Sequence, residues 1–190
     1  MAKIRKGNKS ALLIVDVQVG VMRDVWEASR IIDNIGTSVE KARKQNIPVI
    51  WVQHSDEELV SGSPDWQLHP ELSPQEEDVR IYKHSNSAFE ETALEETLAQ
   101  LGVTHIVLAG AATNWCIRAT AYAALERGYD LILIEDAHTT RTIELQNDRK
   151  IKAEDIIDEL NIVMEWVSYP GRKNRSVSAA DLDFVFDDAD

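Results

Sequence analysis

Cys116 is the single cysteine of this 190-residue chain, and its surroundings suit a nucleophile. It follows a run of small and polar residues, 110–115 (GAATNW), where a loop is expected to become a helix. The partial positive charge of a helix N-terminus favours the thiolate over the thiol. Free backbone N–H groups in the same turn can receive a developing oxyanion. The ordinary alternative, a buried cysteine acting as a small apolar residue, stays open at this point.

Two charged residues elsewhere in the chain supply what a thiol nucleophile needs, a base to take its proton and a cation to hold the charge. Asp16 directly follows the apolar run 11–15, and Lys83 follows the short run 79–82. Each has an ordinary alternative, since aspartate is common in turns and lysine is mostly exposed. Their placement at corresponding ends of apolar runs favours one shared site.

The apolar runs alternate with amphipathic stretches of helical period. Continuous apolar strands that alternate with helices are typical of an α/β fold, a mainly parallel sheet with helices on both faces. In such sheets ligands bind outside the carboxyl ends of the strands, where Asp16, Lys83 and Cys116 are expected. The predicted strands are 11–15, 47–52, 103–109, 130–134 and 162–166, with a short run at 79–82. The predicted helices are 31–42, 90–101, 114–127 and 151–160.

Two segments fall outside this alternation. Residues 55–78 contain three prolines and eight acidic residues but no lysine or arginine. They are predicted to be a long excursion over the strand ends, either a lid or a solvated surface loop. Residues 170–190 are predicted to be a polar extension that packs on a neighbouring subunit or frays. The whole chain, 1–190, is expected to form one domain, with an N-terminal arm at 1–9.

Composition excludes several classes of partner. The 20 basic and 33 acidic residues give a formal net charge of −13, which repels nucleic-acid phosphates. No apolar run approaches the ~20 residues of a membrane-spanning helix. The first ten residues lack the apolar stretch of a signal peptide, and one cysteine excludes a disulfide scaffold. We therefore expect a cytoplasmic protein with neither a nucleic acid nor a membrane as partner.

Three segments of the chain carry a recognisable combination of motifs. The first is ALLIVDVQ at 11–18, and the second is Lys83 with SAF at 87–89 and Thr92 beyond it. The third is GAATNWCIRAT at 110–120, followed by Gly128-Tyr129 and by Asp136-Ala137-His138. In order and spacing, these segments resemble the isochorismatase-like superfamily of cysteine hydrolases, over approximately residues 10–166.

This resemblance implies a Rossmann-like three-layer α/β/α fold with a catalytic triad of Asp16, Lys83 and Cys116. It implies a non-proline cis peptide between Ala111 and Ala112, with the backbone N–H groups of Ala112 and Cys116 forming the oxyanion hole. The implied activity is hydrolysis of a small-molecule amide, a non-peptide C–N bond, through a thioester on the cysteine.

Metal binding differs among members of the superfamily. The segment 62–70 resembles metal-free hydrolases, including the streptothricin-hydrolase type. Metal-binding relatives carry an Asp-x-His pair after the second strand, whereas this chain has His54 and Asp56 in the reverse order. A metal held by this pair with His69 or His84 is the alternative, but we expect no metal and no cofactor.

The substrate pocket is expected to lie beside the triad, with tryptophan rings as walls for a planar amide. The expected pocket residues are Met22, His54, Trp66 and Trp115. Trp26 and Trp166 are assigned to packing instead. The five tryptophans, together with the resemblance, predict a homo-oligomer.

Two other functions remain open on the same scaffold. An ether or ester hydrolase of the isochorismatase type would need Asp16 but would tolerate loss of the thiol. A thiol sensor or interaction protein would have no catalytic activity. The intact set of Asp16, Lys83 and Cys116 argues against this last alternative.

Overall fold

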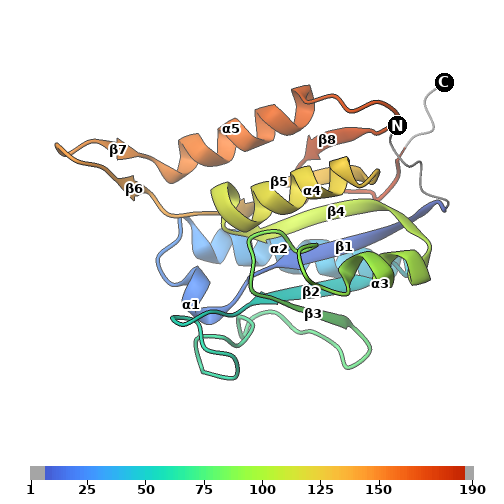
Figure 1. Ribbon diagram of the computed structural model, residues 1–190, viewed down its shortest axis with the longest axis horizontal. Coiled ribbons are helices and arrows are strands. Elements are labelled where there is room, and N and C mark those ends of the chain that lie inside the picture. The colour runs from blue at the N-terminus through green and yellow to red at the C-terminus, as the bar shows by residue number, and fades with distance from the viewer. Residues whose placement is uncertain (1–6, 187–190) are drawn as a thin grey trace.

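A computed structural model describes residues 7–186 of the protein (Figure 1). In that part of the chain a six-stranded sheet has the order β3–β2–β1–β4–β5–β8, and all neighbouring strands are parallel. Its strands are β1 (Lys9–Val15), β2 (Val49–His54), β3 (Val79–Lys83), β4 (Val103–Ala111), β5 (Asp130–Thr139) and β8 (Asn174–Val177). Positions 1–6 of the expected N-terminal arm and 187–190 of the expected extension lie outside the described residues.

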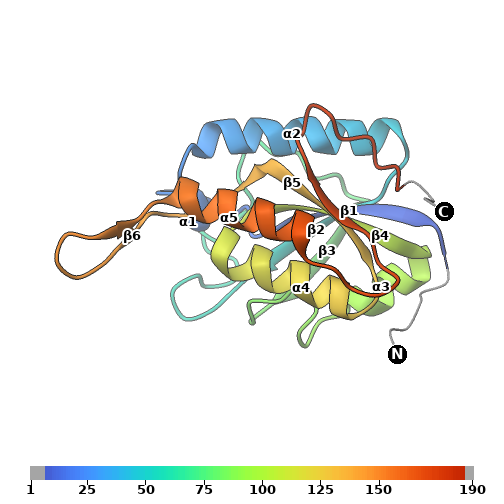
Figure 2. The ribbon, with the colours of Figure 1, turned by 90° about the horizontal axis from the view of Figure 1, so that it is seen from above.

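Helices cover both faces of the sheet (Figures 1 and 2). Helix α2 (Ala28–Lys44) packs on one face. Helices α3 (Leu94–Leu101), α4 (Arg118–Glu126) and α5 (Ala153–Trp166) pack on the other. The short α1 (Val19–Met22) follows β1 at its carboxyl end. The predicted three-layer α/β/α architecture with a parallel sheet is confirmed.

The apolar pattern explains this layering. After its first residue, β1 is buried throughout, because both faces of a central parallel strand are covered. Helix α2 buries Ile31, Ile35, Val39 and Ala42, the residues whose three- and four-residue spacing predicted a helix. None of the helices in residues 7–186 has the length and hydropathy of a membrane span.

The strand predicted at 162–166 is wrong, because these residues form the last turns of α5. The helix buries Ile156, Ile157, Leu160 and Met164, so the helical period simply continues beyond the predicted end at residue 160. The short apolar run 162–166 resembles a strand only when it is considered apart from the helical spacing of the residues before it.

The last strand of the sheet, β8, lies instead in the segment predicted to be a polar extension. It pairs with β5 in parallel at the edge of the sheet. Beyond it, Ala179, Leu182 and Phe184 are buried on the face that α2 covers. The described part of this segment therefore belongs to the core of the same chain and does not fray.

Most other element boundaries differ from prediction by one to three residues, and two of the differences have an identifiable cause or consequence. Helix α3 begins at Leu94 and not at residue 90, since Glu91 has a left-handed backbone with a φ of 51°. Strand β5 continues to Thr139, five residues beyond its predicted end. That continuation places His138 beside Gly110 of β4.

Between β5 and α5 the chain forms an antiparallel hairpin, β6 (Ile143–Glu144) and β7 (Lys150–Ile151). The hairpin projects away from the layered body in both ribbon views (Figures 1 and 2). We refer to residues 141–152 as the arm.

Candidate active site

Asp16, Lys83 and Cys116 meet at the carboxyl edge of the sheet. Asp16 follows β1, Lys83 ends β3, and Cys116 lies in the turn after β4. The Lys83 Nζ lies 2.6 Å from Asp16 Oδ2 and donates to Cys116 Sγ at 3.2 Å. It also donates to the carbonyl oxygen of Ser85 at 3.1 Å. The ammonium therefore bridges the carboxylate and the thiol.

Local backbone geometry brings the cysteine turn against β1. At Gly110, which has a φ of 127°, a Cβ would lie 2.0 Å from the carbonyl oxygen of Val15, so only glycine permits this close approach. The peptide bond between Ala111 and Ala112 is cis. A π-helical turn, Thr113–Ile117, then carries Cys116 into α4, where the sequence predicted a single helix over 114–127.

A buried hydrogen-bond chain that the sequence analysis did not assign holds this turn. His138 Nδ1 lies 2.9 Å from Thr113 Oγ1, and its Nε2 lies 2.9 Å from Asn161 Oδ1. An amide oxygen can only accept, so Nε2 carries the proton and Nδ1 accepts from the threonine hydroxyl. Burial lowers the pKa of His138 to about 4, which keeps the ring neutral at physiological pH. The sequence offered one signal for this buried histidine, its position shortly after the apolar run that predicted the strand 130–134.

The charge state of the thiol differs from the prediction. Burial first, and then the negative charge of Asp16, raise the pKa of Cys116 to about 12, although the Lys83 ammonium acts in the opposite direction. The resting group is therefore a thiol, and the predicted resting thiolate at a helix N-terminus is wrong. The turn is π-helical, and Cys116 as a residue is only 9% exposed, so desolvation outweighs the helix dipole.

Burial also raises the pKa of Asp16 above its ordinary value, while the ammonium of Lys83 lowers it. The carboxyl group is almost completely buried beside the sulfur that it would deprotonate. A carboxylate with a raised pKa is a stronger base than one in water, which suits it to take a proton from a thiol.

Alkylation of Cys116 by iodoacetamide tests these charge states, because the chain has no second cysteine. Asp16→Asn removes a charge that raises the pKa of the thiol, so we expect the labelling rate to rise at a lower pH than in the wild type. Lys83→Met removes a charge that lowers the pKa of the thiol, so we expect the rise at a higher pH. The measurement is the pH profile of labelling by intact mass over about pH 7–11, with urea-unfolded protein as the control for intrinsic reactivity. A rise at a higher pH in Asp16→Asn than in the wild type would contradict the assigned charges.

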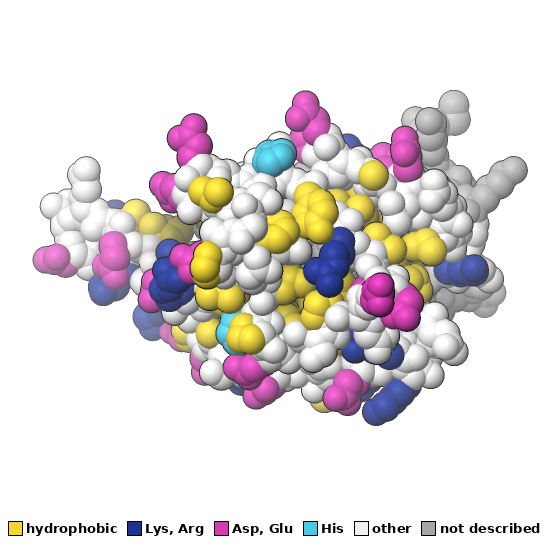
Figure 3. Space-filling view, turned by 90° about the horizontal axis from the view of Figure 1, so that it is seen from below, with side chains coloured by type: hydrophobic (Ala, Val, Ile, Leu, Met, Phe, Trp, Pro, Cys, Tyr) yellow, Lys and Arg dark blue, Asp and Glu magenta, His cyan; other side chains and the backbone are white. Residues whose placement is uncertain are grey.

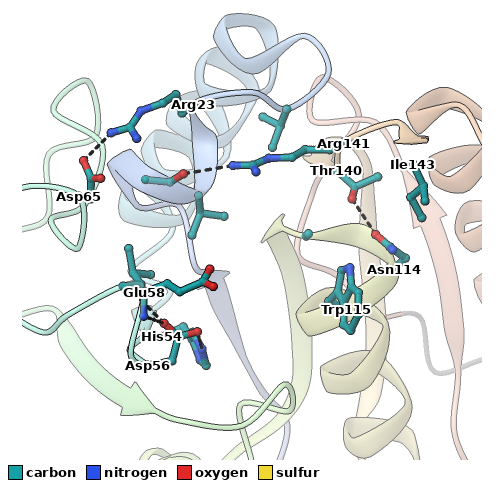
Figure 4. Close-up of a pocket in the computed structure, with 15 residues that line it drawn as sticks. Arg23, His54, Asp56, Glu58, Asp65, Asn114, Trp115, Thr140, Arg141 and Ile143 are labelled. Atoms are coloured by element: carbon teal, nitrogen blue, oxygen red, sulfur yellow. Dashed lines mark hydrogen bonds and ion pairs between the residues drawn. The ribbon is translucent and has the colours of Figure 1, made fainter. Parts of the chain in front are cut away.

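A cavity of about 470 Å³ opens against the cysteine turn (Figure 4). Ala112, Asn114 and Trp115 from the cysteine turn form one wall, and His54 from the end of β2 lies opposite. Cys116 is adjacent in sequence to this wall, although its own side chain is not part of the lining. The cavity therefore gives a small substrate access to the main chain of the cysteine turn.

Two of the four expected pocket residues lie elsewhere. His54 and Trp115 line the cavity, but Met22 is buried in the core between α2 and the sheet. Trp66 is also absent from the lining, and its ring packs against Tyr82 with centroids 5.6 Å apart. The short helix α1 turns Met22 inward, which a sequence pattern around one residue does not reveal.

Segment 55–78 contributes to the cavity wall. Asp56, Glu58, Leu59 and Asp65 from this segment are among the lining residues. Backbone hydrogen bonds from Gly20 to Asp65 and from His69 to Val17 fix it against the chain after β1. At the rim, Arg23 pairs with Asp65, and Arg141 of the arm donates to the carbonyl of Gly20 (Figure 4).

The histidines near the cavity have protein partners. His54 Nε2 lies 3.1 Å from Asp56 Oδ2, and the other oxygen of Asp56 accepts backbone N–H groups of the following loop. His84 Nδ1 lies 2.9 Å from the carbonyl oxygen of Ser55. Within residues 7–186 no group of three His, Cys, Asp or Glu side chains is arranged to hold a metal ion.

An ammonium placed between a carboxylate and a thiol at the carboxyl edge of a parallel sheet is typical of cysteine hydrolases with an α/β fold. Residues 10–163 match the isochorismatase domain. The chain belongs to the isochorismatase family, as its sequence motifs predicted.

Named relatives include amide-hydrolysing enzymes. The chain is 31% identical over 144 residues to streptothricin hydrolase of Streptomyces noursei, covering 73% of this chain and 52% of that protein. It is 31% identical over 171 residues to the ureidoacrylate amidohydrolase RutB of Klebsiella pneumoniae, covering 68% and 72%. The chain thus spans about half the length of the streptothricin hydrolases that it matches.

Solved structures agree with the fold. An isochorismatase from Pseudomonas putida superimposes with a TM-score of 0.82 at 25% identity, covering 96% of this chain and 94% of that one. N-carbamoylsarcosine amidase from Thermoplasma acidophilum gives a TM-score of 0.74 at 24% identity, covering 92% and 99%. The second likeness concerns the fold alone.

Proposed function

We propose that this protein hydrolyses a small-molecule, non-peptide amide through a thioester on Cys116. The observation that carries the proposal is the buried ammonium of Lys83 in contact with both Asp16 and Cys116, at 2.6 and 3.2 Å. The relatives named as a streptothricin hydrolase and a ureidoacrylate amidohydrolase support C–N hydrolysis over ether hydrolysis.

In the proposed reaction, Asp16 takes the thiol proton as the sulfur attacks the amide carbon. The charge that develops on the sulfur is held by Lys83, which already contacts it. Asp16 then gives the proton to the leaving nitrogen, the C–N bond breaks, and a thioester remains. Asp16 next takes a proton from water, hydroxide adds to the thioester, and the acid and the free thiol are released.

The backbone N–H groups of Ala112 and Cys116 are the proposed oxyanion hole. Ala112 borders the cavity, and its N–H forms no hydrogen bond with the described part of the chain. A backbone donor without such a bond, at the edge of a cavity and four residues before the nucleophile, suits a developing oxyanion. Loss of one such donor typically costs ~10²–10³ in rate.

Release of ammonia from a panel of primary amides and ureides, with ring opening of lactams followed in parallel, tests the proposed function. We expect turnover of at least one compound class by the wild type and none by Cys116→Ala under the same conditions. Product formation by both proteins from a vinyl ether, with no amide hydrolysed by either, would support the isochorismatase-type ether chemistry instead.

We further propose that no metal or cofactor takes part and that residues 1–190 form a single catalytic domain. EDTA dialysis should therefore leave the rate of amide hydrolysis unchanged.

We also propose that the protein is located in the cytoplasm, because a free, essential thiol persists best in a reducing compartment. We also propose that the chain self-associates, since Trp166, which was assigned to packing, is 82% exposed.

A further inference from the structure

The arm, residues 141–152, has a composition unlike the rest of the molecule. It carries four basic and two acidic side chains, although the whole chain has a formal net charge of −13. It also exposes the apolar residues Leu145 and Ile151. Lys150 and Lys152 contact glutamates of the same copy but remain more than half exposed. The arm is thus a basic, partly apolar element on an acidic protein.

The strands of the arm form few backbone contacts with the rest of the molecule. These strands are two residues long and lie outside the central sheet. The space-filling view shows the arm projecting from the body with apolar and charged side chains at its surface (Figure 3). A two-stranded hairpin is marginally stable at best in water by itself, so packing of the projecting part of the arm on another surface would stabilise it.

A surface of complementary character lies between α2 and α5. A groove of about 500 Å³ there is lined by four acidic residues, Glu135, Asp136, Asp158 and Glu165. Its one basic lining residue, Arg30, is paired with Glu27. Burial and the neighbouring carboxylates raise the pKa of Glu135, as expected where negative charge is not neutralised.

Apolar side chains border the same groove. Ile162, which lines it, is 53% exposed, and Trp166 lies one helical turn further along α5. Arg149 and Lys152 lie three residues apart, ~10 Å in an extended arm, and Asp158 to Glu165 span ~10 Å of helix, so the two pairs of charges match in spacing. The arm of the same copy points away from the body and does not lie in this groove (Figures 1 and 2).

We propose that the arm of one copy docks in the α2–α5 groove of a second copy, and that the two copies exchange arms about a two-fold axis. Arg149 and Lys152 face Asp158 and Glu165 of the other copy, and the apolar residues of the arm cover Ile162 and Trp166. Each copy offers both surfaces, so the contact closes as an isologous dimer.

Docking would also affect the cavity. Arg141 and Ile143, at the base of the arm, are among the residues that line it. Holding the arm therefore holds one wall of the cavity. Arm exchange would be the contact through which the chain self-associates, and it does not depend on the proposed amide hydrolysis.

Charge reversal tests the interface through the molar mass of the assembly in sedimentation, so no activity assay is needed. We expect wild-type protein at about 10 μM to sediment as a dimer or a multiple of it, and the dimer to weaken with added salt. The arm variant Arg149→Glu/Lys152→Glu and the groove variant Asp158→Lys/Glu165→Lys should each raise the dissociation constant about tenfold or more. An equimolar mixture of the two variants, or all four changes in one chain, should restore association.

The matched control is Glu76→Lys/Glu77→Lys, an equal charge change in the exposed loop before β3, on the opposite side of the molecule from α5 (Figure 1). This control should sediment with the same molar mass of assembly as the wild type. A monomeric wild type, or charge-reversed variants that assemble like the wild type, would overturn the proposal.

Cross-linking locates the contact. In a Cys116→Ala background, Leu145→Cys and Ile162→Cys placed in one chain should form a disulfide between copies on oxidation. A disulfide within one copy, seen as a monomer of altered mobility on a non-reducing gel, would contradict arm exchange.

Discussion

Replacing Cys116 with alanine is expected to lower kcat for amide hydrolysis by about 10⁴-fold or more, the scale seen when a covalent nucleophile is removed. No other side chain at the site can take its place, because Lys83 is bound to Asp16 and to the carbonyl of Ser85. Initial rates with the best substrate of the panel, at enzyme concentrations raised to detect slow turnover, give the measurement.

The fold should survive this change. Alanine removes only the sulfur atom, and Lys83 keeps its two oxygen partners. We therefore expect the free energy of unfolding in urea to stay within ~1 kcal/mol of the wild type. Cys116→Ser, which keeps a hydrogen-bonding atom, is the matched control and should be equally stable. Substantial amide hydrolysis by a stable Cys116→Ala protein would rule out the thioester route.

The sequence was sufficient to group the three residues of the proposed triad, because Asp16 and Lys83 directly follow two predicted strands and Cys116 comes shortly after a third. Parallel strands buried on both faces make such runs conspicuous, and their carboxyl ends share one edge of the sheet. Asp16, Lys83 and Cys116 could therefore be grouped before any coordinates, and the family motifs fixed the same three positions.

The charge state and the pocket were harder to predict. Whether Cys116 is a thiol or a thiolate depends on desolvation, which is a property of everything packed around it. Met22 and Trp66 lie away from the cavity because α1 and the 55–78 segment turn them elsewhere, through backbone contacts distant in sequence. The edge strand β8 was missed because an edge position needs few apolar residues to pair with its one neighbour.

Lys83→Met should have the second large effect, on stability as well as on rate. It leaves Asp16 buried without the charge that compensates it, and removing one partner of a buried pair costs ~3–5 kcal/mol. The rate of amide hydrolysis should fall to the level of Cys116→Ala, because no cation remains to hold charge on the sulfur. Urea unfolding and initial rates on the same preparations measure both effects.

The pH dependence of stability separates this cause from a general packing defect. Without Lys83 the pKa of Asp16, already raised by burial, rises further. A carboxyl group with a higher pKa in the folded state than in the unfolded state contributes stability below its unfolded pKa, near 3.8, and loses it as pH rises through the folded pKa. The stability deficit of Lys83→Met should therefore be small at about pH 4 and grow toward pH 7.

Asp16→Asn/Lys83→Met supplies the decisive comparison, since it removes both charges at once. A neutral pair of similar volume no longer buries an uncompensated charge, so we expect most of the lost unfolding free energy to return at pH 7. Activity should not return, because the base and the cation are both absent. If the double variant is as unstable as Lys83→Met, or if the deficit of Lys83→Met does not change with pH, the buried charge of Asp16 is not the cause. Lys83 would then act mainly by filling space beneath the cysteine turn.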